Sequence, residues 1–398
     1  MELRTTTMRI AATATAASLV LASASAAVEQ PCDPILVGQT DTPASDYAVA
    51  IEGRYAFVCD LSRNAFVRHG LVVLDIDNPS APTQVGWVEL PDDPWDLVVD
   101  AGLAYVAAGE DGLVVVDVSD PALPVIIGAR GGPTHAKGID IAGHFAYVAG
   151  GRNDGLWIYD IADPADPAVV AYLALPQDAY KVRVRDGLAY VAALGAGLQI
   201  VDVGNPLAPF IVGVFDAGDP VNDIALGDTT AVLACGEPAG LRTIDISDPA
   251  WPTEIARHSF VEYRSAYGVT ARGTIAVVGT QYGVHIMDLA DPAAPNEIGL
   301  YPLTGASAHR AILDGNLAYV PVRGAGPIVL DLTGCFDATT PCNAADFAPP
   351  FGVLDQADVA VFVGAFLSGD PAVDLDANAI HELRDLIAFV DAFVSGCP

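Results

Sequence analysis

The sequence predicts an all-β fold, a closed ring of seven four-stranded sheets, followed by a small α-helical module. Two observations predict the ring. An apolar strand that ends in Asp recurs every 42 or 43 residues, ending at Asp75, Asp117, Asp160, Asp202, Asp245, Asp288 and Asp331. A pair of prolines follows six of these strands and marks a corner before a further strand. Units of about 40 to 45 residues with several short strands are typical of the blades of a β-propeller.

Each unit contains four predicted strands, of which the strand ending in Asp is the third. A glycine precedes every third strand, and we expect it to adopt positive φ in a hairpin. These glycines are Gly70, Gly112, Gly155, Gly197, Gly240, Gly283 and Gly326. The terminal Asp recurs in all units. We therefore interpret it as a turn residue that accepts backbone N–H bonds, rather than as a functional group.

The seventh unit ends at Cys335 without a fourth strand. The missing strand is predicted near the start of the chain, because Pro34, Val37 and Gly38 have the offsets of the fourth strands in the complete units. Pairing this segment with the last blade closes the ring and removes open sheet edges. In that register Cys32 and Cys335 occupy successive repeat positions, so we expect a disulfide between them.

These motifs resemble the LVIVD repeat family of secreted and cell-surface β-propellers, over about residues 32–335. The strand that gives the family its name reads LVVLD at 71–75 and LVVVD at 113–117. The resemblance implies a seven-bladed propeller. It implies no particular activity, because the family is not tied to one chemistry.

Residues 1–26 are expected to be a secretory signal peptide, since Arg4 and Arg9 precede a short Ala/Leu/Val run and small residues. The alternative is an uncleaved anchor, but the apolar run is shorter than the roughly 20 residues of a membrane span. We expect a propeller over 27–335 in a secreted or cell-surface protein, with no transmembrane span in the mature chain. The net charge of −32 argues against nucleic acid as a partner.

Functional residues of a propeller should differ between blades, whereas structural residues repeat. The start of each innermost strand faces the channel mouth, and the two positions there vary between units. The candidate ligand-binding residues are Tyr47, Trp95, Asp96, Lys137, Tyr180, Lys181, Asn222, Asp223, Tyr267, His309 and Arg310. Aromatic faces with polar tips suit a carbohydrate or a peptide or other protein ligand. Lys137, Lys181 and Arg310 favour an anionic group such as a uronate or another carboxylate. The alternative is that these side chains only plug or rim the channel.

No catalytic residue is assigned. His309 with Asp96 or Asp223 could supply acid–base chemistry, yet the sequence contains no nucleophile motif, no HExxH and no Gly-rich phosphate loop. We therefore expect a binding or interaction protein. The alternatives are a hydrolase or lyase acting on a polysaccharide, and a purely structural surface protein.

After Cys335 the period gives way to two related stretches with helical spacing, which begin at Asp358 and Asp385. Oxygen-bearing residues occupy positions 1, 3, 5, 9 and 12 of the loop before the second stretch, a spacing that suits calcium. They are Asp374, Asp376, Asn378, Glu382 and Asp385.

Residues 336–398 resemble a type I dockerin, an EF-hand-like module with a duplicated loop–helix unit, although Ala379 stands where glycine is usual. The resemblance implies bound calcium and a cohesin-like or cell-surface partner that tethers the protein. Cys342 and Cys397 flank the module, and we expect them to pair because small secreted domains commonly need such a crosslink.

Overall fold

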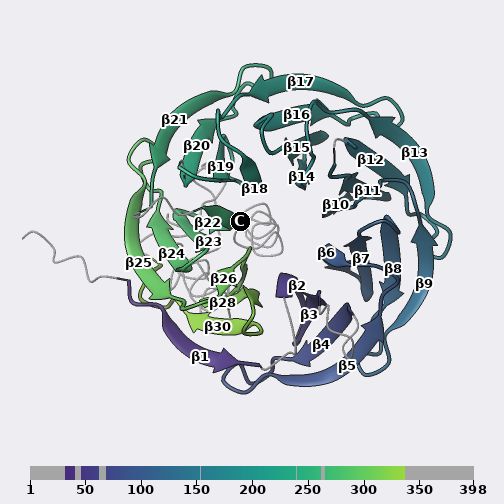
Figure 1. Ribbon diagram of the computed structural model, residues 1–398, viewed down its shortest axis with the longest axis horizontal. Coiled ribbons are helices and arrows are strands. Elements are labelled where there is room, and N and C mark those ends of the chain that lie inside the picture. Colours follow the sequence, from purple (N-terminus) through teal and green to yellow (C-terminus); the bar gives the residue numbers. More distant parts are fainter. Residues whose placement is uncertain are drawn as a thin grey trace, which may run out of the picture. The chain divides into compact units, whose positions relative to one another are not determined.

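The computed structural model describes residues 32–40, 46–61, 69–152, 154–238, 240–260 and 265–336. The predicted signal peptide, the calcium ligands Asp374, Asp376, Asn378, Glu382 and Asp385, and the Cys342–Cys397 pair lie outside these residues. Within the described ranges, seven four-stranded antiparallel sheets surround a common centre, as Figure 1 shows. The predicted all-β seven-bladed propeller is confirmed. No helix in these ranges is long and apolar enough to cross a bilayer.

Each blade runs from an innermost strand at the channel to an outer strand at the rim. The innermost strands are β2 (Asp46–Glu52), β6 (Pro94–Asp100), β10 (Gly138–Ala142), β14 (Lys181–Arg185), β18 (Val221–Leu226), β22 (Ala266–Arg272) and β27 (Ile312–Asp314). The second strands are β3 (Tyr55–Asp60), β7 (Leu103–Ala108), β11 (Phe145–Ala149), β15 (Leu188–Ala192), β19 (Thr230–Cys235), β23 (Ile275–Thr280) and β28 (Leu317–Val320).

The third strands, with their terminal Asp, are β4 (Gly70–Asp75), β8 (Leu113–Asp117), β12 (Leu156–Asp160), β16 (Leu198–Asp202), β20 (Leu241–Asp245), β24 (Gly283–Asp288) and β30 (Ile328–Asp331). The outer strands are β5 (Thr83–Glu89), β9 (Val125–Arg130), β13 (Ala168–Leu173), β17 (Phe210–Phe215), β21 (Thr253–His258), β25 (Asn296–Pro302) and β1 (Ile35–Gln39). Blade 7 has an additional two-stranded sheet, β26 (Ser307–Ala308) with β29 (Val322–Arg323).

The core consists of apolar clusters between neighbouring blades, and each pair of neighbours shares one. The cluster that joins blade 7 to blade 1 contains Val58 and Val72 from one side and Tyr319 and Val329 from the other. The last blade therefore packs on the first blade through the same kind of contact that joins the other blades. The ring is closed.

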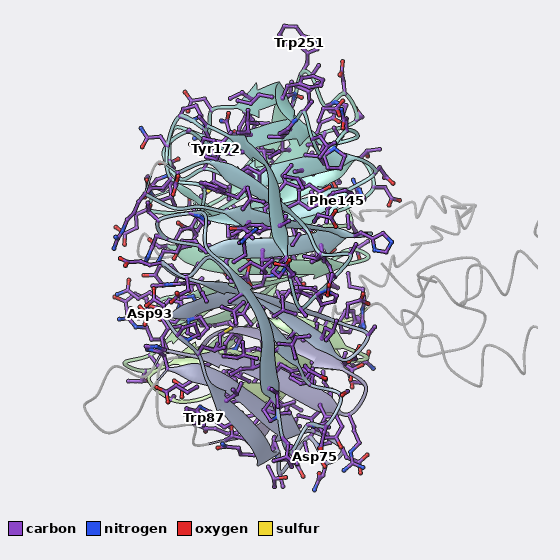
Figure 2. All side chains as sticks on the ribbon, turned by 90° about the vertical axis from the view of Figure 1, so that its right-hand side faces the viewer. Asp75, Trp87, Asp93, Phe145, Tyr172 and Trp251 are labelled. Carbon is purple, nitrogen blue, oxygen red and sulfur yellow. A yellow bond between two sulfur atoms is a disulfide. The ribbon has the colours of Figure 1, made fainter. Side chains whose placement is uncertain are left out.

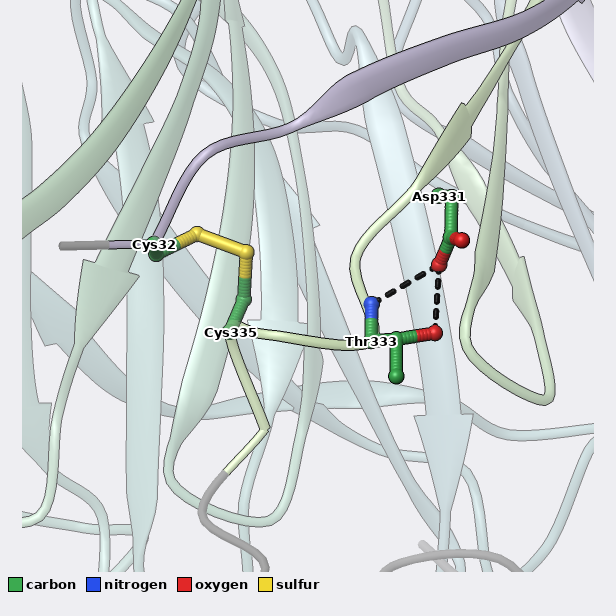
Figure 3. The surroundings of a disulfide bond; sticks show 4 residues. All are labelled: Cys32, Asp331, Thr333 and Cys335. Carbon is green, nitrogen blue, oxygen red and sulfur yellow. Dashed lines mark hydrogen bonds between the residues drawn. A yellow bond between two sulfur atoms is a disulfide. The ribbon is translucent and has the colours of Figure 1, made fainter. Parts of the chain in front are cut away.

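The predicted closure by the start of the chain is confirmed. Strand β1 pairs antiparallel with β30. The outer strand of blade 7 therefore comes from the N-terminal end of the sequence that forms the propeller. Cys32, just before β1, forms a disulfide with Cys335, 303 residues later, with Cα atoms 4.5 Å apart (Figure 3). This crosslink holds together the two ends of the repeat array.

The terminal Asp of every third strand accepts a hydrogen bond through Oδ1 from the backbone N–H two residues later, at 2.8–3.0 Å. Figure 3 shows the bond from Thr333 to Asp331 beside the disulfide. At Asp117 the hydroxyl of Ser119 adds a second bond, and the two bonds lower the pKa of the Asp117 carboxyl. The interpretation of these residues as turn residues is confirmed.

The glycine before each third strand has positive φ in five blades, as predicted, with values of 68–73° at Gly155 and Gly112 for example. The prediction is wrong for Gly70 and Gly283, which do not have positive φ. Glycine is needed there for another reason: a Cβ would lie 2.4 Å from the Val88 carbonyl oxygen at Gly70, and 2.6 Å from that of Tyr301 at Gly283. The close approach of the outer strand therefore excludes a side chain at both positions.

Candidate functional site

A β-bulge stands at the variable position of the innermost strands. In β2, β6, β18 and β22 the pairing with the second strand skips one residue, and the skipped residues are Tyr47, Trp95, Asn222 and Tyr267. In three other blades the variable residue donates its backbone N–H to the second strand just before the ladder begins. These bonds run from Lys137 to Ala149, from Tyr180 to Ala192 and from His309 to Pro321. A bulge redirects a side chain relative to the regular alternation of the strand.

The redirected side chains meet at one mouth of the channel. Eight of the eleven candidate residues line a single pocket there: Tyr47, Trp95, Lys137, Tyr180, Lys181, Tyr267, His309 and Arg310. The volume that they leave is about 10 Å³, which is on the order of a single water molecule. The side chains thus come together as predicted, but they nearly fill the mouth, so a larger ligand must bind over them or beside them.

Ring contacts hold this aromatic plug together. The Tyr47 ring lies 4.8 Å from the Trp95 ring and 4.5 Å from the His309 ring, measured between centroids, and Tyr267 stacks on the other side of His309 at 5.5 Å. The Lys137 Nζ atom lies 2.8 Å from the centroid of the Trp95 ring, a cation–π contact. The plug is a packed layer contributed by six blades, all except blade 5.

Three candidate residues do not line the pocket and instead contact other blades. Asp96 pairs with Lys181 at 2.9 Å and accepts a bond from the Ile139 backbone. Asp223 pairs with Arg183 at 3.5 Å, and burial raises the Asp223 pKa against the attraction of that guanidinium. Asn222 donates to the Ala266 carbonyl at 2.7 Å. These contacts already occupy the polar groups of Asp96, Asn222 and Asp223, which leaves them less able to bind a ligand. A ligand role for the three residues remains a prediction.

The histidines of the mouth are neutral at pH 7. Burial, together with the charges of Lys181 and Arg323, lowers the pKa of His309 to about 3. Burial and Lys137 lower the pKa of His135 to about 4. Among the described residues, no hydrogen-bond partner reaches the buried His309 Nε2, Trp95 Nε1 or Arg310 Nε. Buried polar atoms are normally satisfied, so we expect a water molecule in the remaining space of about 10 Å³ to bind at these atoms.

A larger cleft opens beside the plug, between blades 6 and 7. Its volume is about 470 Å³, within the range of small-molecule sites, which is roughly 300–1,000 Å³. Its lining residues are Tyr267, Gln281, Tyr282, Gly305, Ala306, Ser307, Arg323 and Gly324. Tyr267 belongs to both the plug and the cleft, and the Arg323 guanidinium lies 5.7 Å from the centroid of the Tyr47 ring. The cleft and the plug therefore form one continuous surface.

The cleft follows from the irregular inner part of blade 7. Pro321 has no N–H to donate and separates β28 from β29. Strand β29 then pairs with β26, at the start of the innermost segment of the same blade. In blade 3, by contrast, the corresponding residue Ala136 donates to Gly109 of the preceding blade at 2.7 Å.

The sequence interpretation missed Gln281, Tyr282, Ser307 and Arg323. A signal for two of them was present in the repeat. Five residues after the Ala that marks each second strand, blades 1 to 5 carry only apolar residues or glycine: Leu61, Gly109, Gly151, Leu194 and Gly236. Blades 6 and 7 carry Gln281 and Arg323 at this position. The hairpin turns of these two adjacent blades therefore stand out by the same criterion that identified the plug residues.

Comparison with known proteins agrees with the repeat and the fold. The LVIVD repeat model matches residues 45–89, 92–129, 133–173, 176–217 and 237–259. No curated protein matches the chain.

Two solved structures share the architecture at very low sequence identity. The computationally designed Ika8 protein is 9% identical with a TM-score of 0.54, and the match covers 74% of this chain and 99% of that chain. The structure of U3-55K is 8% identical with a TM-score of 0.60, and the match covers 75% of this chain and 98% of that chain. At such identity the likeness concerns the fold alone. The chain is thus a repeat protein whose LVIVD repeats fold into a seven-bladed β-propeller.

Proposed function

We propose that this propeller is a secreted or cell-surface binding protein that recognises a carbohydrate or peptide ligand at the channel mouth where the plug and the cleft meet. The observation that carries the proposal is the convergence of non-repeated side chains, three of them at bulges, beside a cleft of about 470 Å³. Aromatic rings with polar tips offer flat faces and hydrogen bonds to such a ligand.

Export and tethering belong to the same proposal. The stretch 1–26 would direct export, and the module at 336–398 would attach the propeller to a cohesin-like or cell-surface partner, with calcium in its second loop. Support comes from the sequence patterns of both segments and from the disulfide between Cys32 and Cys335, since disulfides persist in oxidising compartments.

The enzymatic alternative is less favoured by the contacts of its proposed residues. Asp96 and Asp223 pair with Lys181 and Arg183, while His309 is stacked between Tyr47 and Tyr267. General acid–base chemistry needs the acid and the base within hydrogen-bond reach of a substrate. Turnover of a polysaccharide that disappears in His309→Ala would nonetheless favour a hydrolase or lyase.

The proposal is tested by measuring binding of the full chain to glycan and peptide arrays. Tyr267→Ala, which removes a ring shared by the plug and the cleft, should weaken the affinity for any ligand at least about tenfold. Tyr172→Ala is the matched control, because Tyr172 is 45% exposed on the outer strand β13, at the rim. If the array ligands bind both variants as tightly as the original protein, or if nothing binds, the channel mouth is not a recognition site and the purely structural alternative is favoured.

A further inference from the structure

Both lysines of this acidic chain and two of its arginines lie at one place. The sequence contains only two lysines, Lys137 and Lys181, and both line the plug. Arg310 lines it as well, and Arg323 lines the adjoining cleft. In a protein with a net charge of −32, four cations lie at this mouth, and one of them, Lys181, is neutralised by Asp96. Such a group of cations attracts an anionic ligand.

These cations differ in what already binds them. Lys181 is buried and paired with Asp96, and Lys137 lies against the Trp95 ring. Arg323 is exposed, and no carboxylate of the described residues lies within ion-pair distance of it. Its guanidinium lies over the Tyr47 ring. Arg323 is therefore the cation of this region that is best placed to receive a negatively charged group from solution.

The other groups of the cleft are neutral and polar or aromatic. Tyr267 and Tyr282 supply rings, and the amide of Gln281 and the hydroxyl of Ser307 supply donors and acceptors. Tyr282 is 42% exposed. A hydroxyl-rich ring could stack on a tyrosine face and bond to Gln281 and Ser307. A guanidinium binds a carboxylate through two parallel N–H···O bonds, which adds orientation as well as energy.

A saccharide fits this lining better than a peptide does. Peptides commonly bind by adding a strand to a free sheet edge or by laying a helix in an apolar groove. The cleft is instead lined by turn residues and by β26 and β29, which have two residues each and are too short to form a template for an added strand. Among the lining residues only Ala306 has an aliphatic side chain.

We propose that the cleft between blades 6 and 7 binds an acidic sugar of the uronate type, with its carboxylate on Arg323 and its ring against Tyr267 or Tyr282. This inference rests on the proposed binding function and specifies its ligand class. It assigns the anionic group to Arg323 in the cleft, whereas the sequence pattern favoured Lys137, Lys181 and Arg310 in the plug.

The test compares trigalacturonic acid with its fully methyl-esterified form, measured by calorimetry on the full chain. The free acid should bind at least about tenfold more tightly than the ester, and its affinity should fall as salt is raised, because the ester retains the hydroxyls and loses the charge. Arg323→Ala should abolish the difference between acid and ester, and Arg323→Lys should retain part of it. Arg257→Ala is the control, since Arg257 is 65% exposed on the outer strand β21, away from the cleft.

The outcomes separate this inference from the broader proposal. Equal binding of acid and ester, or an acid preference that survives in Arg323→Ala, overturns the acidic-sugar assignment. If array ligands that are neutral glycans or peptides bind in a Tyr267-dependent way and trigalacturonic acid does not, recognition at the mouth stands while the acidic-sugar assignment fails. If no ligand of any class binds, both fail. An unchanged thermal unfolding curve for Arg323→Ala would show that its effect is on binding rather than on folding.

Discussion

The junction between blades 6 and 7 differs from the junctions between blades 2 and 3, 3 and 4, and 4 and 5. In those three, the hairpin turn of one blade and the start of the next innermost strand share a backbone hydrogen bond: Ala136 to Gly109, Gly151 to Ala179 and Val221 to Leu194. At the junction of blades 6 and 7, the start of the innermost segment pairs with β29 of its own blade, and the turns carry Gln281 and Arg323. At the three regular junctions the hairpin turn is hydrogen-bonded to the neighbouring blade. At the junction of blades 6 and 7 the turns instead line the cleft, which has room for a ligand.

Blade 7 combines this irregularity with the closure of the ring. No other blade has both roles. Blade 7 completes the fold with a borrowed strand and a disulfide, and it forms one wall of the cleft. Loss of the closure should therefore cost stability, whereas changes in the cleft should mainly affect binding.

The largest expected effect tests the closure. Cys32→Ser with Cys335→Ser removes a crosslink between residues 303 apart, and the chain-entropy model predicts a loss of about 5 kcal/mol in the free energy of unfolding. Denaturant unfolding under non-reducing conditions measures it. The unchanged protein treated with a reductant should lose a similar amount, and the double variant should not respond to reductant. A loss below about 1 kcal/mol would mean that the apolar contacts between blades 7 and 1 suffice to close the ring.

The next largest effect is on the stability of the protein at acidic pH. The His309 pKa is about 3 in the folded protein, whereas an unfolded chain has a histidine pKa near 6.5. Between these values the unfolded state binds the proton that the folded state excludes, so stability falls as pH decreases from about 6.5 toward 3.

His309→Gln removes this titration from blade 7. From pH 7 to pH 4 the variant should lose less stability than the original protein, by on the order of 2 to 3 kcal/mol. The exposed His144 lies outside the plug, so His144→Gln is the control and should follow the original protein. Parallel pH profiles for the original protein and His309→Gln would contradict the neutral, buried state of this imidazole.

The smallest expected effect is the cost of adding a side chain where two blades meet. It is compared between blades 4 and 5 and at the contact of blade 6 with Cys32. At Gly213 of blade 4 a Cβ would lie 1.9 Å from the Pro249 carbonyl oxygen of the next blade. At Gly299 of blade 6 the nearest atom would be the Cys32 carbonyl oxygen, at 2.5 Å. Overpacking of this kind commonly costs about 1–3 kcal/mol. Gly213→Ala should cost about 2 kcal/mol in thermal or denaturant unfolding.

Gly299→Ala should cost less than Gly213→Ala, because its contact is longer. The natural alanine at the same repeat position in blade 3, Ala171, supplies the control: Ala171→Gly adds no steric conflict and should cost less than Gly213→Ala. Equal losses at Gly213 and Gly299 would mean that the two junctions pack equally tightly.

The features of the fold that repeat could be predicted from the sequence. The terminal Asp residues, the blade count and the borrowed strand follow from spacing alone, because each unit must supply the same backbone bonds to its neighbour. The Cys32–Cys335 disulfide followed from the same register. Gly70 and Gly283 show the limit of this reasoning, since glycine can be required by a close contact as well as by positive φ.

The candidate site could be predicted only in part. The first variable position of each innermost strand identified most of the plug. The second position, one residue later, was expected to face the mouth as well, but Asp96 and Asp223 at this position lie in buried contacts between blades. Gln281 and Arg323 could have been singled out from the repeat, but the shape of the cleft could not be predicted. The shape depends on the separation of β28 from β29 at Pro321 and on the pairing of β29 with β26. Such a choice between partners is decided in three dimensions.

The bulge at the head of four innermost strands, β2, β6, β18 and β22, has a consequence for how such proteins diversify. A residue that opposes no partner in the ladder carries little of the pairing energy, so its replacement leaves the sheet on either side intact. Tyr47, Trp95, Asn222 and Tyr267 occupy such positions, so exchanging these side chains should disturb the surrounding scaffold least. A library randomised at these positions would be expected to yield folded variants with new specificities, and mutations in the regular strands would not.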